Sequence, residues 1–211
     1  RCVPGGSKGP SGHRHNDQLS FELSVDGEDV IVDWGTGVYT SDSEVRNRFR
    51  STANHSTAYP HGQEQNRLIP GRDGVFVLRD TTAARCITVE AAKFVGEHSG
   101  YGKVHQRAVT LQENAIVIED SLNVSGGFRI SLTMAEGVTP VVRKSNVDGS
   151  VVDLDNGVVV IQIDSTAVDT AIEHGQLSRG YGMLQDAWLL GYSVDQGSSR
   201  LTLRNPSRGN P

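Results

Sequence analysis

The sequence has 211 residues, a formal net charge of -5 and a mean hydropathy of -0.36. This length suffices for one large or two small domains, and 21% charged residues is typical of a globular rather than a disordered chain. The acidic balance argues against general nucleic-acid binding, and no apolar run approaches the roughly 18 residues that a membrane span needs. The chain begins with arginine rather than methionine, so we expect a mature or excised piece of a longer protein.

Three regions of different composition divide the chain. Residues 1–12 are largely glycine, proline and serine, and predict a flexible leader or linker. Residues 13–204 are expected to form the folded domain, and the polar residues 205–211 a frayed tail. Cys2 and Cys86 are the only cysteines. They could pair, but we favour two unpaired thiols because Cys2 lies in the loose leader, and two cysteines form no metal-site spacing.

A β-hairpin is predicted near the start of the domain. Apolar and polar residues alternate from Leu19 to Val25, which indicates a half-buried strand. Asp26-Gly27 then predicts a tight turn, because both central residues of a type I′ turn need positive φ. The returning strand ends at Asp33. The facing pairs in this register are Val25–Glu28, Leu23–Val30, Phe21–Val32 and Leu19–Trp34.

The rest of the chain reads as short strands. A single helical turn is predicted at 43–50, with Ser43 as its N-cap, and Asn156-Gly157 predicts a second hairpin. The strands are expected near 75–79, 85–91, 103–111, 115–122, 128–134, 138–143, 150–154, 157–164, 167–173, 184–193 and 199–204. Many short strands without alternating helices predict an all-β fold, one large two-layer antiparallel β-sandwich with few or no long helices.

Four of the seven histidines fall within residues 12–65, and they suggest a metal site. His13 and His15 point the same way on an extended segment, and with Asp33 and His55 they offer nitrogen and oxygen donors that suit zinc. In the predicted register Asp33 faces Ser20, so a ligand shared with His15 requires the backbone near residues 14–17 to leave the ladder. The loop-forming pair Asn16-Asp17 permits this. A surface histidine pair without metal is the alternative.

The other candidate residues predict no second site. His105 alternates into a predicted strand and is interpreted as a structural histidine. His98 and His174 lie beside glycine and are expected at the surface. Asp120 ends a predicted strand, where a role in a turn is favoured over acid catalysis.

Two stretches resemble a known family. They read GHRHNDQLSFELSVDGEDVIVDWGTGVYT at 12–40 and RNRFRSTANHST at 46–57. They are similar to the C-terminal β-sandwich domain of the heparinase II/III-like polysaccharide lyases. That domain typically opens with a G-H-x-H-x-D-x-L-S-F-like run and continues through a V-D-P-G-T-like loop to F-R-S-T-x-x-H-N. Weaker similarities at 102–107, 118–120 and 178–182 extend the resemblance over nearly the whole chain.

The resemblance implies a role for each matching residue. His13 would reach the active cleft, while His15, Asp33 and His55 would bind a structural zinc ion that fixes the base of the cleft. Three positions depart from the family pattern without removing a proposed ligand, namely Trp34, Ser56 and His61.

The resemblance also implies β-elimination at a uronic acid. A base removes the proton α to the carboxylate, and an acid protonates the departing glycosidic oxygen. Tyr39 is a candidate proton donor or stacking platform, with an ordinary tyrosine of the sandwich as the alternative. Arg46 and Arg50 are candidate contacts for acidic sugars, because guanidinium pairs with carboxylate or sulfate. A solvated helix face is the alternative for these arginines.

The expected partners follow from the same resemblance. The substrate would be an acidic polysaccharide such as a glycosaminoglycan or alginate. A helical (α/α) toroid domain, which this chain lacks, would supply the rest of the active site, so the chain alone is expected to hold half of it. A periplasmic or secreted bacterial location is expected from the family only. No nucleic-acid or membrane partner is expected.

Two other functions remain open from the sequence. The chain could be a non-catalytic, metal-stabilised module that binds acidic sugar or a partner domain, in which case His13 is not needed for product formation. It could also be a metal-free sandwich with a solvated histidine cluster, in which case a chelator changes nothing.

Overall fold

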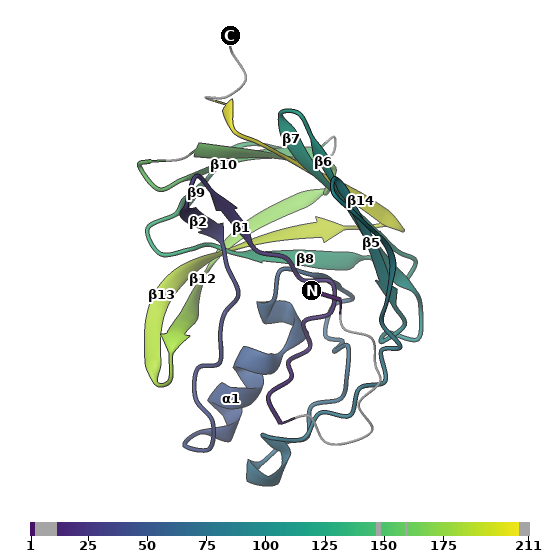
Figure 1. The fold of residues 1–211 in the computed structure, drawn as a ribbon, viewed down its shortest axis with the longest axis vertical. Helices are drawn as coiled ribbons and strands as arrows, with labels where there is room; N and C mark the ends of the chain where they lie inside the picture. The colour runs from purple at the N-terminus through teal and green to yellow at the C-terminus, as the bar shows by residue number, and fades with distance from the viewer. Residues whose placement is uncertain (3–11, 147–148, 159, 207–211) are drawn as a thin grey trace.

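The computed structural model describes residues 1–2, 12–146, 149–158 and 160–206, and most of its regular structure is β-strand (Figure 1). The strands are β1 (Leu23–Val25), β2 (Glu28–Ile31), β3 (Ala58–Tyr59), β4 (Arg85–Glu90), β5 (Lys93–His98), β6 (His105–Gln112), β7 (Ala115–Leu122), β8 (Phe128–Thr133), β9 (Thr139–Asn146), β10 (Gly149–Asp155), β11 (Val160–Ser165), β12 (Asp169–Gly180), β13 (Met183–Val194) and β14 (Ser198–Arg204). The helical segments are α1 (Ser43–Arg50) and the 3-10 turns η1 (Thr52–Asn54) and η2 (Arg72–Gly74).

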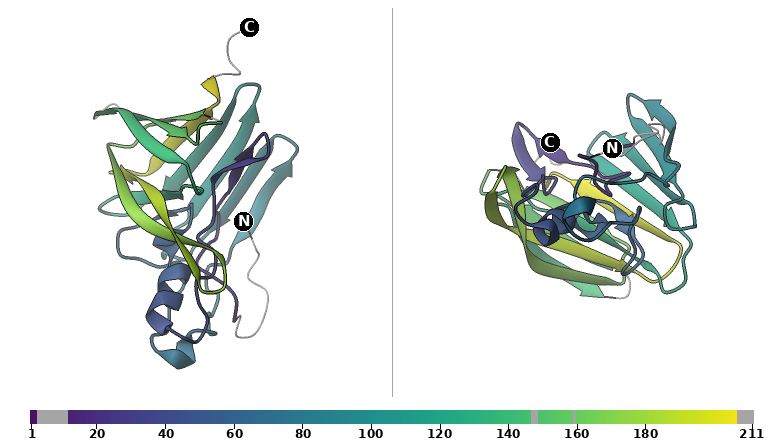
Figure 2. Two further views of the ribbon diagram at one scale, coloured as in Figure 1. Left: turned by 90° about the vertical axis from the view of Figure 1, so that its left-hand side faces the viewer. Right: turned by 90° about the horizontal axis from the view of Figure 1, so that it is seen from below.

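Two antiparallel sheets form the body of the domain. The larger has eight strands in the order β4-β5-β6-β7-β14-β11-β10-β9, and the smaller has four in the order β12-β13-β8-β3. Figure 2 shows the sheets facing each other, with α1 and the irregular segments gathered beyond one end of them. The predicted all-β sandwich is confirmed.

The core lies between the two sheets and is built by alternation along the strands. Ile118 and Leu122 of β7 project into it from the large sheet, and Ile130 and Leu132 of β8 from the small sheet, all with no exposed surface. Burying one such side chain stabilises the fold by about 1.5–3 kcal/mol. The period of two that predicted the strands is therefore also what builds the core.

One predicted strand does not form, and two observed strands, β3 and β5, were not predicted. Residues 75–79 form no strand; they follow η2 as a loop, although their apolar run is typical of a strand. The inward positions of β5 include Gly96 and His98, so β5 lacks the apolar alternation by which strands are recognised.

The first hairpin forms, but its predicted register fails after two residue pairs. Val25 faces Glu28 as expected, and a bulge between Leu23 and Ser24 then places Leu23 opposite Ile31. The chain at the end of β2 then contacts the end of β8, where the Val32 N–H donates to the Thr133 carbonyl at 2.9 Å. The predicted pairs of Phe21 with Val32 and of Leu19 with Trp34 do not form, because the incoming chain leaves the ladder before the returning chain does.

The helical turn at 43–50 is confirmed, with a different cap. Asp42 is the N-cap, and its carboxylate accepts from the backbone N–H groups of Glu44 and Val45 at 2.9 and 3.0 Å. Ser43 is the first residue of the helix. Both are good capping residues, and the carboxylate adds a favourable charge at the helix N-terminus.

Most of the predicted leader and tail lies outside the described residues, at 3–11 and 207–211. Arg1 is described, and its backbone carbonyl accepts from the Leu19 N–H at 2.6 Å. The Arg1 side chain pairs with Asp17. The second hairpin forms, but its loop is longer than the predicted Asn156-Gly157 turn, because Asp155 of β10 lies opposite Val160 of β11.

Candidate metal centre and adjoining cleft

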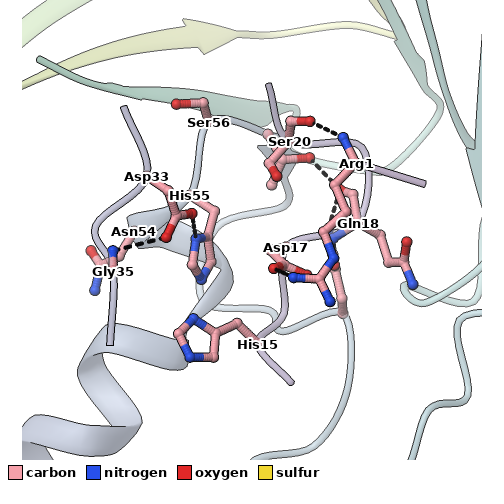
Figure 3. A network of polar contacts seen from close by, with 12 residues as sticks. Arg1, His15, Asp17, Gln18, Ser20, Asp33, Gly35, Asn54, His55 and Ser56 are labelled. Carbon is pink, nitrogen blue, oxygen red and sulfur yellow. Dashed lines mark hydrogen bonds and ion pairs between the residues drawn. The ribbon is translucent and has the colours of Figure 1, made fainter. Parts of the chain in front are cut away.

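Three irregular segments bring the predicted metal ligands together at one end of the sandwich (Figure 3). His15 precedes the first hairpin, Asp33 follows β2, and His55 follows η1. One ligand atom from each of these residues lies within 4.8 Å of the other two. This cluster, which we call the His/Asp/His centre, contains the three residues predicted as ligands.

Asn16 explains how His15 reaches Asp33. Its backbone N–H donates to the Arg50 carbonyl at 3.0 Å, and its side chain donates to Glu64 and to the Asn66 carbonyl at 2.6 and 2.7 Å. Asn16 has no exposed surface, so these bonds fix the segment inside the protein. Leu19 then turns the chain with a φ of 61°. The break in the ladder that the sequence only permitted is therefore stabilised by buried hydrogen bonds.

Asp33 and His55 form a close pair. His55 Nδ1 lies 2.6 Å from Asp33 Oδ2, and the other carboxylate oxygen accepts from the Gly35 N–H at 2.8 Å. Burial opposes protonation of His55, but the neighbouring Asp33 charge outweighs it and raises the His55 pKa. Burial likewise opposes ionisation of Asp33, but the His55 charge and hydrogen bond lower its pKa. The pair is thus stabilised as carboxylate and imidazolium.

His15 has the opposite character. Burial, together with the charges of His55 and Arg46, lowers the pKa of His15 to about 3, so its ring is neutral at neutral pH. Arg46 Nη1 lies 2.9 Å from His15 Nε2. Because guanidinium can only donate, Nε2 accepts, and the neutral ring carries its proton on Nδ1. An ion bound at either nitrogen must replace that proton or the Arg46 bond.

The residues of the centre fit a zinc ion. His55 is completely buried, yet its Nε2 has no hydrogen-bond partner within the described structure. Two imidazoles and one carboxylate are a donor set that zinc accepts with a fourth position for water. Since ligands bind in their deprotonated forms, an ion at His55 Nε2 would displace the Nε2 proton of the imidazolium, while Nδ1 could keep its hydrogen bond to Asp33.

A cavity of about 350 Å³ adjoins the centre. Its lining joins the centre to the residues around it: Arg1, His13, His15, Asp17, Ser20, Phe21, Glu22, Asp33, Gly35 and Thr36. His13 is exposed at this cavity, and its ring meets the ring of Tyr39 edge to face, 5.6 Å between centroids. The structure thus brings both predicted catalytic residues, His13 and Tyr39, to one side of the centre.

The two predicted substrate arginines are internal. Arg46 and Arg50 have no exposed surface. Burial, with the neighbouring Arg50 charge, lowers the pKa of Arg46 to about 10. Arg50 donates to the carbonyls of Gly74, Val75 and Val77 at 3.1, 2.6 and 3.0 Å. In the described structure, both guanidinium groups therefore make their contacts inside the protein.

A buried polar network, which contacts the chain next to His55 through Arg107, was not predicted from the sequence. Arg107 pairs with both oxygens of Asp120 at 2.8 and 2.9 Å, and His105 Nε2 lies 2.7 Å from the same carboxylate. His98, expected at the surface, is buried and lies 3.1 Å from His105. Asp120, expected in a turn, is a buried residue of β7. The signal for this network was the alternation of His105 and Arg107 onto one strand face.

The fold and the site define a large antiparallel β-sandwich domain with a histidine–aspartate centre at one end. Residues 1–194 match the family model described as heparinase II/III-like, C-terminal. The chain belongs to this heparinase II/III-like family, and the resemblance stated from its sequence is confirmed. Among curated proteins, no sequence matches the chain.

Solved structures share the fold at low identity. The heparan sulfate lyase HepC from Pedobacter heparinus is 20% identical with a TM-score of 0.70, covering 97% of this chain and 32% of its own. A structure of heparinase III is 18% identical with a TM-score of 0.71, covering 92% of this chain and 30% of its own. This chain thus spans about a third of the proteins it matches. No helix within the described ranges is long and apolar enough to cross a membrane.

Proposed function

We propose that this chain is the β-sandwich part of a polysaccharide lyase that cleaves uronic-acid-containing glycans by β-elimination. The observation that carries the proposal is the His/Asp/His centre beside a cavity lined by the exposed His13. The family membership supports the lyase class, and the heparan sulfate lyase among the structural neighbours supports an acidic polysaccharide as substrate. We expect such an enzyme in the periplasm or outside the cell.

The proposed chemistry uses His13 and Tyr39 as the proton-transfer groups of this chain. His13 removes the proton from the carbon α to the uronate carboxylate, and the electron pair forms the new carbon–carbon double bond. The β carbon–oxygen bond breaks, and the departing glycosidic oxygen receives a proton from Tyr39. The rings of these residues are in contact, so both can face one sugar.

His15, Asp33 and His55 are proposed to hold a structural zinc ion. Bound there, the ion supplies a link between the three segments and so fixes the floor of the cavity. Arg46 then has a positioning role, because it contacts His15 on one side and the face of Tyr39 on the other, 5.5 Å from the ring centroid.

The remaining part of the active site is proposed to come from a helical toroid domain. The matched structures are about three times the length of this chain, which leaves room for such a domain. The uronate carboxylate must be neutralised in the transition state, and we expect groups of that domain to contribute to this.

The test is product formation by the intact gene product, followed by the ultraviolet absorbance of the unsaturated uronate. Heparan sulfate and alginate are the two polymers to supply. We expect His13→Ala to abolish the signal and His61→Ala, a change at an exposed histidine outside the cavity, to retain it. Retention of polymer without unsaturated product would instead support a binding module. Full activity of His13→Ala would refute the assignment of the base.

A further inference from the structure

Three aromatic side chains from separate segments lie in a row beside His13. Tyr39 is the middle ring, 6.0 Å from Phe76 and 5.5 Å from Tyr181 between centroids, with interplanar angles of 29° and 20°. Rings in direct face contact lie only about 3.5–4 Å apart, so neither pair makes a full face-to-face contact. We call Phe76, Tyr39 and Tyr181 the aromatic row.

Tyr181 is held in this row by backbone hydrogen bonds. It lies in the turn between β12 and β13, where the Gly182 N–H donates to the Gly37 carbonyl at 2.8 Å. Within β12, the Ser178 N–H donates to the Trp34 carbonyl at 2.8 Å. The hairpin tip is thus fastened at two points to the loop that carries Tyr39.

Phe76 is held by Arg50. The three carbonyls that accept from the Arg50 guanidinium belong to Gly74, Val75 and Val77, which surround Phe76 in the chain. A loop whose carbonyls are used in this way cannot turn freely. The aromatic row is therefore a built surface, in which two independent anchors place the outer rings against Tyr39.

The outer rings of the row remain open to solvent. Tyr181 is 60% exposed and Phe76 is 36% exposed. Contiguous exposed apolar groups on a soluble protein commonly mark a binding surface. The row also continues the cavity, because His13 lines the cavity and contacts the rings of Tyr39 and Phe76 at 5.6 and 6.0 Å.

The shape and chemistry of the row suit a sugar chain. A pyranose presents C–H groups on its faces and hydroxyl groups at its rim, so its faces pack on aromatic rings while its rim stays hydrated. The exposed outer rings, on either side of Tyr39, offer separate apolar contacts to neighbouring sugars. Arg46 lies over the ring of Tyr39, which places a positive charge near the row without exposing it.

We infer that the aromatic row is a stacking subsite for the pyranose rings of an acidic glycan, next to the sugar held at His13. This inference rests on the proposed function for the class of ligand. It assigns binding roles to Phe76 and Tyr181, which were not predicted from the sequence. It also implies that the glycan leaves the cavity over the aromatic row.

Binding is measured first, by titration calorimetry of the intact gene product. The probes are uronic-acid-containing tetrasaccharides prepared from heparan sulfate and from alginate. We expect Phe76→Ala and Tyr181→Ala each to raise Kd about tenfold, the effect of losing about 1.4 kcal/mol of ring contact. Tyr181→Phe, which keeps the ring, should restore binding. Met183→Ala removes an equally exposed side chain of the same hairpin tip that has no ring, and should leave Kd unchanged.

Two outcomes overturn the inference. One is an unchanged Kd in both alanine variants, or no binding of either tetrasaccharide to the unmodified protein. The other is a lower melting temperature of the intact protein in Phe76→Ala with no change in Kd. That result would show that another part of the polypeptide covers the row.

Kinetics separate this inference from the proposed function. If both hold, Phe76→Ala acts mainly by raising KM, whereas His13→Ala abolishes kcat. If no unsaturated product forms but Phe76→Ala still weakens tetrasaccharide binding, the subsite stands and the lyase assignment fails. If product forms and KM is the same in Phe76→Ala, the lyase assignment stands and the subsite fails.

Discussion

Arg107 donates a hydrogen bond of 2.6 Å to the backbone carbonyl of Ser56, the residue that follows His55 of the His/Asp/His centre. The same nitrogen donates to the carbonyl of Leu19 at 2.8 Å, at the point where the incoming chain turns. A single strand residue therefore holds two of the irregular segments that build the centre. The large sheet positions the site through this side chain.

Loss of Arg107 should be costly. Arg107→Met leaves the buried Asp120 carboxylate without its guanidinium partner, and we expect the free energy of unfolding to fall by about 3–5 kcal/mol. Chemical denaturation measures this loss. Arg143→Ala, which removes an exposed strand ion pair with Asp153, is the control and should cost no more than about 1 kcal/mol. Equal effects of the two changes would contradict the role given to Arg107.

The buried histidine pair should make the protein sensitive to acid. Burial, with the neighbouring His105 and Arg107, lowers the pKa of His98 to about 3 from an ordinary 6.5. Between these values the unfolded chain binds more protons than the folded one, so stability falls as the pH drops below about 6.5. The slope from this histidine is at most about 1.4 kcal/mol per pH unit.

His98→Asn tests this dependence, because asparagine can still accept from the Gly100 N–H but does not titrate. Denaturation at about pH 7.5 and about pH 5.5 should show a smaller difference in the variant than in the unmodified protein. His174→Asn, at an exposed histidine whose ring contacts Trp188, is the matched control and should keep the full difference. The same pH difference in His98→Asn would rule out His98 as its source.

Gly35 should tolerate no side chain. Its φ is 76°, and an added Cβ would lie 2.2 Å from the Ser178 carbonyl oxygen. Gly27 has a similar φ of 88° but nothing within 4 Å, so Gly27→Ala measures the backbone cost alone, about 1–2 kcal/mol. We expect Gly35→Ala to cost about 1–3 kcal/mol more, because the hairpin tip must move away. Thermal or chemical unfolding of both variants gives the difference, and equal costs would disprove the close contact.

Metal removal tests the His/Asp/His centre. We expect about one zinc ion per chain by mass spectrometry of protein purified without a histidine tag, and a lower melting temperature after chelation. Because Asp33 raises the His55 pKa, zinc must displace a proton there, so zinc affinity should increase as the pH rises. Asp33→Asn should lose the ion and His61→Ala should keep it. Background zinc with an unchanged melt would refute the metal assignment.

The parts of the fold that follow alternation could be predicted from sequence. Ile130 and Leu132 on β8 show the expected period of two, and their strand lies where predicted. The run at 75–79 is equally apolar, yet Arg50 satisfies its carbonyls where a neighbouring strand would otherwise do so. The local sequence pattern cannot reveal these hydrogen bonds, because Arg50 lies 25 residues away from Val75 in the chain.

The clustering of the candidate site could be predicted. Donor chemistry and the resemblance both pointed to His15, Asp33 and His55, and the structure brings these three residues together. The roles of Arg46 and Arg50 could not be read from spacing, since a buried and an exposed arginine look alike in a helical turn. Phe76 and Tyr181 gave no signal either, because their contact with Tyr39 joins three segments that are distant in sequence.

The bonds of Arg50 to three neutral carbonyls also determine how the surface beside His13 responds to ionic strength. Dissolved salt screens charges at the surface over about 10 Å at 0.1 M, but it hardly affects a buried donor bound to uncharged acceptors. Added salt should therefore weaken the attraction of an acidic ligand while the loop around Phe76 keeps its shape. The salt dependence of Kd then reports the charged contacts between ligand and protein, without a contribution from a change in the shape of this loop.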